Sequence, residues 1–578
     1  MTDDRLDRMG AFDAVMWGVE QDPVLRSVIV AMTLLDEQPD IDVLVDRIDR
    51  MTLAVPKLRQ RVIGNPVSLI PPRWEFDPNF DISYHLKRYH VPADGTDRPL
   101  MRIAEQLGEQ DFDRDRPLWE MALVQGFDGP RAAVIIKLHH AITDGVGGMA
   151  MAASLFDLTR TPPADLGPRP PDPAGNVLGL AGRVANGAQF AAKSVVRRGQ
   201  AIAEGAVGLA SRTAADPGEA AVAGAAFAQS AARLLAPAAE PLSPLMHGRS
   251  LSCHMAVVAV PFAPFKAASK SVGGTLNDAY LAAVSGGVAR YHDLHNAPAD
   301  YVRVNMPVNM RAGGVDDAGG NRWVPARFPM PLDSGDPVAR IKRLSPLLKQ
   351  ARTEPALMLS DSIYRLLTAL PQSAATSISA GMMKGCDLAV TNLPGPPIAL
   401  YAAGAQALAI VPFAPKAGAA ANIGLMTYNG VAYIGLNIDT RAIPDPGVFI
   451  EHIRAGFDEI LAIADPTAHA SVGVHSGTPP AEGARTDKPR PRRGPAARPA
   501  RKAAAKAAAK PAAEAAQQPA EEPAEGAPAK PATKAAKRTA KKPGKKPAEP
   551  PEPPAAEPPA AEPPEPRVAE PPAAPPAP

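Results

Sequence analysis

Two adjacent histidines in a glycine-rich segment are the residues of this chain best suited to chemistry. His139 and His140 follow the apolar run Ala132–Leu138, and Asp144 comes four residues after the second histidine. A neutral imidazole at the end of a strand can face a cleft and accept a proton from a hydroxyl or an amine near neutral pH. Asp144 could fold back to order the loop, while Gly145 and the glycines after it allow tight turns. The segment therefore predicts a general base on an ordered loop.

Three other interpretations of the histidine pair compete with this one: a buried structural histidine, a metal-binding pair and a turn without function. Adjacent residues on a strand point to opposite faces, and no convincing third ligand lies nearby in the sequence, so the metal pair is disfavoured. The other two interpretations stay open from the residues alone.

The elements that must position this segment show an alternating pattern. Between residues 12 and 160, helix-like stretches alternate with β-branched runs such as Ser27–Met32, which indicates an α/β or α+β domain. The alternation resumes near residue 241 with the run Ala256–Val260, a helix over Leu276–Tyr291 and a strand over Tyr301–Met306. We expect folded domains at residues 1–160 and 241–465.

The segment between these domains, residues 161–240, is rich in Ala, Gly and Pro and is predicted to be a partly helical linker. Within it, Val177–Arg198 places apolar residues near helical spacing among arginines and lysine. Such a stretch would suit an anionic membrane surface, but packing against a domain is the commoner role of such a stripe and is the one we favour.

Residues 470–578 are predicted to be a disordered tail. Of the 67 prolines in the chain, 27 lie in residues 479–578, which contain no aromatic residue. Such a composition buries too little apolar surface to fold. Residues 485–546 carry 18 basic and 5 acidic side chains. A segment of this kind either binds nucleic acid or anionic lipid, or serves as a solvated spacer.

Charge and cysteine content exclude several classes of protein. The tail from residue 479 has 19 Lys/Arg and 12 Asp/Glu, so the 578-residue chain of net charge +2 has a body of charge −5. A folded core that binds nucleic acid is therefore disfavoured. Two cysteines cannot form a disulfide framework, and the acidic N-terminus is unlike a signal peptide. The uncharged run Leu388–Pro415 is interrupted by prolines and predicts two buried strands joined by a turn.

The segment His139–Gly145 resembles the HHxxxDG motif of the bacterial wax ester synthase/diacylglycerol acyltransferase family, relatives of condensation domains and chloramphenicol acetyltransferase. Further segments are similar to family motifs and occur in the expected order over about residues 10–464. They are Phe12-Asp13-Ala14, Glu20, Pro56–Arg61, Pro117-Leu118-Trp119, Asn277-Asp278, Pro307–Arg311, Gly320-Asn321-Arg322 and Thr391–Pro396. Two departures are Gly10-Ala11 in place of Ser-Pro and Cys253-His254 in place of an arginine pair.

The resemblance implies an α/β (α+β) fold of two chloramphenicol-acetyltransferase-like domains packed around a central tunnel. The residues to which it gives roles are His140 as general base, His139 in support, Asp144 and Gly145 in ordering the loop, and Asn277, Asp278 and Trp119 in substrate binding. Core packing is an alternative for the tryptophan, and helix capping is an alternative for the Asn-Asp pair. No metal and no cofactor are implied, since acyl-CoA is a substrate.

The predicted function is an acyl-CoA-dependent O-acyltransferase that acylates diacylglycerol and also long-chain alcohols. We expect it in the cytoplasm, peripherally associated with the inner face of the membrane or with lipid droplets. Two alternatives remain at this point: a condensation-type acyltransferase that takes its acyl group from a carrier protein, and a catalytically silent lipid-body scaffold with a polyanion-binding tail.

Overall fold

The computed structural model describes residues 8–474, with gaps at 65–70, 162, 164–165, 173–176, 180, 194–239, 310–322 and 353–371. The predicted tail beyond residue 474, most of the predicted linker, and the motif residues Met310, Arg311 and Gly320-Asn321-Arg322 lie outside the described residues.

The first sheet has six strands in the order β11-β12-β1-β6-β5-β4. Its neighbouring strands are antiparallel, except that β4 and β5 are parallel. The strands are β1 (Val28–Leu35), β4 (Leu86–His90), β5 (Trp119–Gln125), β6 (Ala132–His139), β11 (Tyr401–Ala402) and β12 (Ala405–Phe413).

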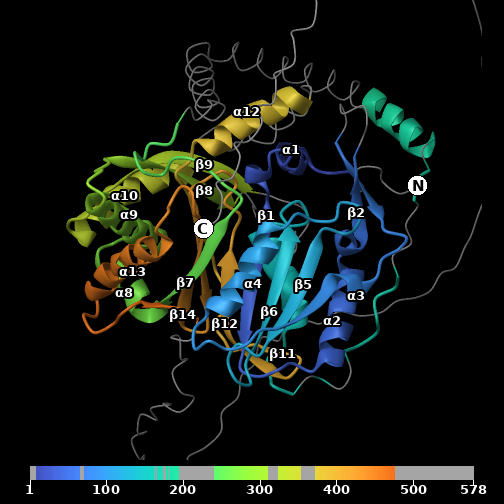
Figure 1. Cartoon of the computed structure of the whole chain (residues 1–578), viewed down its shortest axis with the longest axis horizontal. Coiled ribbons are helices and arrows are strands. Elements are labelled where there is room, and N and C mark those ends of the chain that lie inside the picture. Colours follow the sequence, from blue (N-terminus) through green and yellow to red (C-terminus); the bar gives the residue numbers. More distant parts are fainter. Residues whose placement is uncertain are drawn as a thin grey trace, which may run out of the picture. The chain divides into compact units, whose positions relative to one another are not determined.

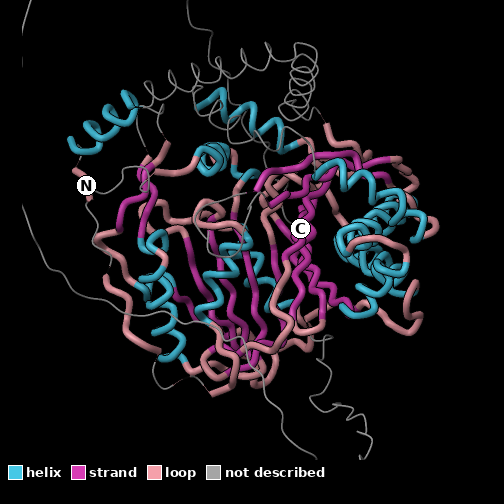
Figure 2. The backbone as a smooth tube through the Cα atoms, turned by 180° about the vertical axis from the view of Figure 1, so that it is seen from behind, coloured by secondary structure: helices cyan, strands magenta, loops and turns pink. Residues whose placement is uncertain are grey.

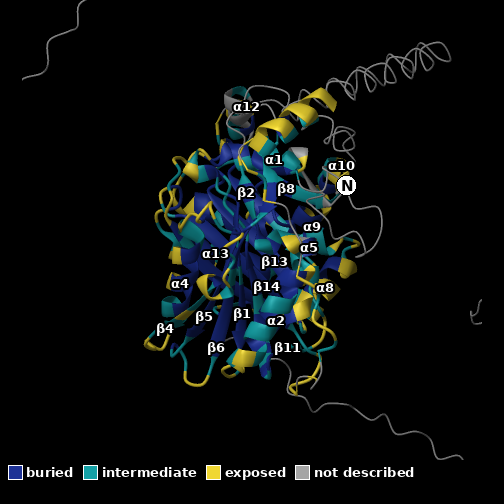
Figure 3. Cartoon of the chain, turned by 90° about the vertical axis from the view of Figure 1, so that its right-hand side faces the viewer, coloured by how far each residue is buried: buried dark blue, intermediate teal, exposed yellow. Residues whose placement is uncertain are grey.

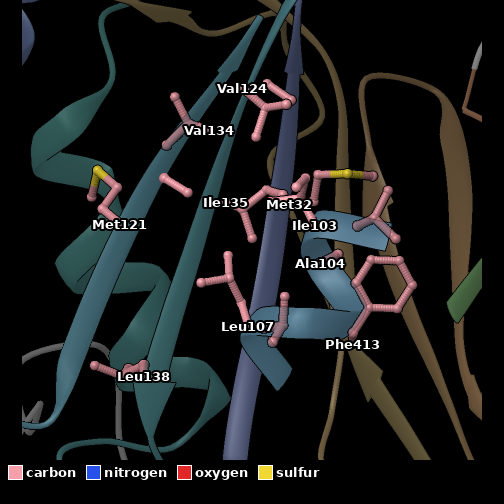
Figure 4. Packing of buried hydrophobic residues seen from close by; sticks show 14 of the residues in the cluster. Met32, Ile103, Ala104, Leu107, Met121, Val124, Val134, Ile135, Leu138 and Phe413 are labelled. Carbon is pink, nitrogen blue, oxygen red and sulfur yellow. The ribbon is translucent and has the colours of Figure 1, made fainter. Parts of the chain in front are cut away.

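Helices α2 (Ile41–Ala54) and α4 (Arg98–Glu109) contribute to the core around this sheet. The apolar residues of α4 recur at helical spacing and therefore form one buried stripe. Figure 4 shows Ile103 and Leu107 of this stripe on the side of the strands that carries Ile135, whereas Leu138 points to the opposite face. Neighbouring residues of β6 thus face different surroundings, which matters for the two histidines at its end.

The second sheet has seven strands in the order β15-β7-β14-β13-β10-β8-β9. A layer of helices lies to one side of it, as Figures 1 and 2 show, and Figure 3 shows the strands as the most buried part of the fold. The strands are β7 (Cys253–Pro261), β8 (Tyr301–Asn309), β9 (Trp323–Pro331), β10 (Leu388–Leu393), β13 (Ala421–Tyr428), β14 (Val431–Asp439) and β15 (Ser471–Val472). The helices are α8 (Phe262–Ser271), α9 (Leu276–Leu294), α10 (Pro337–Arg352) and α13 (Pro446–Ala462).

Strand β12 joins the two parts of the chain. The predicted pair of strands joined by a turn over Leu388–Pro415 is wrong in number and pairing, because the run forms β10, β11 and β12. Of these, β10 belongs to the second sheet while β12 pairs with β1 in the first. β12 also passes very close to β14: a Cβ atom at Gly435 would lie 1.9 Å from the Pro412 carbonyl oxygen. Only glycine fits this crossing without a shift of the backbone.

Carboxylates of α4 hold the edge of β7. The Cys253 N–H donates to Glu109 Oε1 (2.7 Å), and the Met255 N–H donates to Glu105 Oε1 (2.8 Å). The chain then continues past the predicted start of the tail at residue 470, because β15 pairs with β7 and the Val474 N–H donates to Asp97 Oδ2 (2.7 Å). Residues 471–474 therefore belong to the fold and not to the predicted tail.

The remaining described elements are helices and the two-stranded sheet β2-β3. They are α1 (Ala11–Val19), η1 (Pro23–Leu25), η2 (Pro56–Arg59), β2 (Gln60–Ile63), β3 (Arg73–Phe76), α3 (Ile82–His85), α5 (Gly145–Ala152), η3 (Ala153–Leu155) and α12 (Gln372–Lys384). A helix over residues 181–193 contacts the first half through Arg183, which pairs with Glu75 (2.9 Å), and through Phe190, which lies under Arg8. In the part of the chain that is described, no helix is long and apolar enough to span a bilayer.

Candidate active site

The histidine segment forms a strand, a turn and a helix. β6 ends at His139, and α5 begins directly after Asp144. Asp144 caps α5: its Oδ1 accepts the Gly147 N–H (2.9 Å), and its carbonyl accepts the Gly148 N–H (2.7 Å). An N-cap carboxylate satisfies N–H groups that have no partner within the helix and lies favourably at the positive end of its dipole. Asp144 is therefore the N-cap of the helix that follows the histidines, and its role in ordering the loop of His140 stays a prediction.

The two histidines differ in exposure and in what holds them. His139 is buried (1 % exposed), whereas His140 is partly exposed. The His140 N–H donates to the Ser27 carbonyl (2.9 Å), just before β1. The backbone of His140 is therefore fixed, and the residue is not fully enclosed, although its Nδ1 is buried. A general base needs access to substrate, so of the two imidazoles His140 has the better environment.

The buried imidazole of His139 lies in an aromatic box. Trp17 of α1 and Phe112 approach the ring edge-on, with centroid distances of 5.4 and 6.0 Å. The Ala141 N–H donates to Nδ1 (3.0 Å), so the proton of a neutral ring is on Nε2. Nε2 lies 2.9 Å from a carboxylate oxygen of Glu20. His139 thus has a defined ring orientation and a defined tautomer.

Glu20 follows α1 directly and is itself buried. Its Oε1 accepts the Ser27 N–H (2.7 Å), and its Oε2 lies 3.7 Å from the Arg114 guanidinium. Arg114 in turn stacks on Trp17 (4.5 Å). In the sequence, Glu20 matches a family position, but neither its type nor its spacing gives it a role. No local pattern connects residue 20 with residue 139, so only the fold reveals the contact.

Lys57 holds the other side of the loop. Its Nζ donates to the carbonyls of Ala141 (3.1 Å) and Ile142 (3.2 Å) and lies over the Trp74 ring (5.2 Å). Burial lowers the pKa of Lys57, and the nearby carboxylate of Asp13 opposes this shift. In the sequence, Lys57 carries no signal of its own beyond its place in the family-like stretch Pro56–Arg61.

A third cation lies deeper on the same face of β6 as His139. Lys137 is fully buried, its Nζ donates to the Asp111 carbonyl (3.2 Å), and it lies 3.5 Å from Glu120 on β5. Burial lowers the pKa of Lys137, while Glu120 acts in the opposite direction. Buried charges are costly unless they are paired. The end of β6 is therefore surrounded by basic side chains, several of which are paired with acidic ones.

Trp119, predicted to contact substrate, is packed into the core. It is buried, its Nε1 donates to the Leu58 carbonyl (2.8 Å), and the His85 ring stacks on it at 4.4 Å. The polar end of the indole is therefore already satisfied. These contacts match the packing alternative.

The predicted residues of the second half meet at the start of α9. Thr275 is the N-cap, and Asp278 completes a capping box by accepting the Thr275 N–H (2.7 Å) and donating its own N–H to the Thr275 hydroxyl (3.2 Å). Asn277 is partly exposed, and its Oδ1 accepts a hydrogen bond from Nδ2 of Asn392 on β10. Asp278 thus caps the helix. Asn277 connects its own motif with the Thr391–Pro396 motif through the hydrogen bond to Asn392.

The structure therefore brings the predicted residues together in two groups, one around His139, His140 and Asp144 and one around Asn277 and Asn392. Gly145 is the first residue of α5. Over the described ranges, no three His, Cys, Asp or Glu side chains are arranged to hold a metal ion.

A small pocket lies where the two halves meet. Its volume is about 40 Å³, and its lining includes Arg26, Glu109, Cys253 and Lys416. Pockets for drug-sized ligands have volumes of about 300–1,000 Å³. This pocket does not hold an acyl chain, and the central tunnel that the resemblance implies stays a prediction.

Comparison with known proteins gives a consistent result for both halves. Residues 9–280 match the wax ester synthase/diacylglycerol acyltransferase catalytic domain, and residues 319–461 match the WS/DGAT C-terminal domain. A protein of Mycobacterium tuberculosis (strain ATCC 25618 / H37Rv) that carries the provisional name of a diacylglycerol O-acyltransferase is 35 % identical over 460 residues, which cover 79 % of this chain and 92 % of that protein.

Solved structures show the same fold at low sequence identity. The wax ester synthase/diacylglycerol acyltransferase from Marinobacter aquaeolei VT8 has a TM-score of 0.52 at 19 % identity, covering 79 % of this chain and 99 % of that one. The first condensation domain of the calcium-dependent antibiotic synthetase has a TM-score of 0.50 at 15 % identity, covering 81 % and 98 %. The predicted mixed α/β fold and the predicted family are thus confirmed. The chain belongs to the wax ester synthase/diacylglycerol acyltransferase family of acyltransferases.

Proposed function

We propose that this acyltransferase moves a long-chain fatty acyl group from acyl-CoA to the free hydroxyl of diacylglycerol and so makes triacylglycerol. Long-chain alcohols are the second acceptor class and would give wax esters. The observation that carries the proposal is the partly exposed His140, whose backbone is fixed to Ser27 at the end of β6 beside a fully buried partner histidine.

In the proposed reaction His140 acts as general base. Its neutral imidazole takes the proton of the acceptor hydroxyl as the oxygen attacks the thioester carbonyl. The carbon–sulfur bond then breaks, the new carbon–oxygen bond remains as the ester, and the imidazolium returns the proton to the leaving thiolate of CoA. No covalent acyl-enzyme is required, because both substrates meet at one imidazole and gain from orientation.

The other groups of the loop serve this base. Asp144 and Lys57 hold the loop through Gly147 and the carbonyls of Ala141 and Ile142. Asn277 and Asn392 provide neutral polar atoms that would contact substrate from the second half. Because the substrates are hydrophobic, we place the reaction at the cytoplasmic face of the membrane or at a lipid droplet, with peripheral attachment.

The test uses the purified full chain with labelled palmitoyl-CoA and dioleoylglycerol in mixed micelles. We expect labelled triacylglycerol, with one free CoA thiol released per ester formed, and a slower reaction with hexadecanol. Palmitate loaded on an acyl carrier protein serves as the alternative donor, since condensation domains share the fold. Ester formation from the carrier alone, or no ester with either donor, would contradict the proposal.

A further inference from the structure

Glu20 contacts the segment of both histidines, although it lies more than a hundred residues before them in the sequence. Its Oε1 is 2.9 Å from Nε2 of His139 and 2.7 Å from the Ser27 nitrogen. The Ser27 carbonyl accepts the N–H of His140 (2.9 Å). One carboxylate oxygen is therefore connected to the ring of the first histidine directly and to the backbone of the second through a single residue.

The surroundings of Glu20 leave it little freedom. The carboxylate is buried, and Ser27 is fully buried as well. Arg114 lies 3.7 Å from Oε2 and is held over Trp17, the same ring that meets His139 edge-on. Hydrogen bonds and ion pairs of this kind hold a buried carboxylate in one place. These contacts fix the position of the carboxylate relative to β6.

The surroundings of the His139 ring depend on this carboxylate. Since Nδ1 accepts from the Ala141 N–H (3.0 Å), the ring proton is on Nε2, the nitrogen that lies 2.9 Å from Glu20 Oε1. The contact at Nε2 is one of close approach and not a hydrogen bond of good geometry, whereas the Ser27 N–H donates to the same oxygen (2.7 Å). Without the carboxylate, the buried Ser27 N–H would lose its acceptor and the His139 ring would lose the group packed against Nε2, so the ring and the start of β1 would rearrange.

We propose that Glu20 is a positioning residue for the catalytic base. It packs against Nε2 of His139 and so fixes the ring, and through Ser27 it holds the backbone of His140 where its imidazole can reach both substrates. The inference rests on the proposed function, in which His140 is the base. A base displaced by about 1 Å loses about 100-fold in rate, so the effect of Glu20 is expected in kcat rather than in substrate binding.

The variants Glu20→Ala and Glu20→Gln separate geometry from charge. The amide oxygen of glutamine can still accept from Ser27 and lie beside the His139 ring, whereas alanine offers no acceptor. We expect Glu20→Ala to lower kcat about 100-fold with the KM for palmitoyl-CoA changed less than about 3-fold. Glu20→Gln should keep kcat within about 5-fold of the wild type, because the isosteric amide preserves the geometry.

Glu75 on β3 provides the matched control. It is also buried (2 % exposed, against 5 % for Glu20), and it pairs with Arg183 (2.9 Å) instead of a motif residue. Glu75→Ala and Glu75→Gln should lower the melting temperature about as much as the Glu20 variants and leave kcat within about 2-fold. An equal loss of kcat in Glu75→Ala, an unchanged kcat in Glu20→Ala, or a loss confined to KM would overturn the inference.

A second readout does not depend on the acyl-transfer reaction. The ring ¹⁵N shifts of selectively labelled histidine report the tautomer, with the His139 signal assigned from its loss in His139→Gln. We expect the Nε2–H tautomer in all three proteins, because the Ala141 N–H holds Nδ1, and a changed Nε2 shift in Glu20→Ala alone, where the oxygen beside Nε2 is missing. If the wild-type protein were inactive with every donor and acceptor, this spectrum would still test the positioning. An unchanged His139 signal in a folded Glu20→Ala would contradict it.

Discussion

The two halves of the molecule place their motifs on different elements and surround them with different groups. In the first half the motif follows strand β6, and its neighbours are ionisable: Glu20 contacts His139, and Lys57 holds the loop carbonyls. In the second half the motif opens helix α9, and its inter-element contact joins the neutral amides of Asn277 and Asn392. Charge is therefore concentrated around one strand end.

This difference indicates how the work is divided. Proton transfer requires an imidazole whose position and hydrogen bonds are controlled, and the paired charges around β6 provide that control. Amides neither gain nor lose protons near neutral pH, so the second half is suited to orienting a substrate. This division can be tested, because each half contains a capping aspartate and a buried histidine that can be substituted in the same way.

The joint between the halves should give the largest change in stability. A Cβ at Gly435 would lie 1.9 Å from the Pro412 carbonyl oxygen of β12, so Gly435→Ala must displace backbone. We expect a loss of about 3 kcal/mol, measured by urea unfolding. Gly447, whose Cβ position is empty, is the control, and Gly447→Ala should cost nothing. Equal stability of the two variants would show that the crossing is not tight.

Substitution of the two capping aspartates allows a direct comparison of the halves. Asp144 caps α5 behind the histidines, and Asp278 completes the capping box of α9. Each alanine variant should lose about 1 kcal/mol of stability. Asp144→Ala should also lose about 10-fold in kcat because the loop of His140 loosens, whereas Asp278→Ala should stay within about 2-fold. A larger kcat loss in Asp278→Ala, measured with palmitoyl-CoA and diacylglycerol, would reverse the proposed division.

The smallest expected effect is a pH dependence of stability that comes from one buried histidine in each half. Burial lowers the pKa of His85, whose Nδ1 donates to the Trp119 carbonyl, and also lowers the pKa of His292, whose Nδ1 donates to the Val288 carbonyl. The unfolded chain therefore binds protons below about pH 6.5 that the folded chain does not bind, and stability falls as the pH decreases. Each residue contributes at most about 1.4 kcal/mol per pH unit.

Unfolding by urea at pH 7 and pH 5 checks this prediction. The double variant His85→Gln/His292→Gln should be less sensitive to this pH change than the wild type, and each single variant should account for part of the difference. A pH dependence that is unchanged in the double variant would show that other groups cause it.

The sequence predicted those parts of the fold that depend on local patterns. The apolar run Ala132–Leu138 is β6, and the stretch Leu276–Tyr291 lies within α9, because strand and helix periodicity and capping residues act over short distances. The crossing of β12 into the first sheet was not predictable in this way, since pairing between β1 and β12 joins residues almost four hundred positions apart.

The same distinction applies to the candidate site. The histidine pair and Asp144 form one contiguous motif that carries its own signal. The roles of Glu20 and Lys57 arise only when α1 and η2 pack against the loop, and neither residue has a spacing that points to the histidines. Trp119 shows the reverse case, in which a motif residue lies in the core with its indole N–H satisfied.

The rate of ester formation by His140→Ala tests the central claim most directly. With labelled palmitoyl-CoA and diacylglycerol, the account predicts a fall in kcat of about 10²–10⁴-fold, the usual contribution of a general base, with the fold intact by circular dichroism. Turnover by folded His140→Ala within about 3-fold of the wild type would contradict the assignment of His140 as the base.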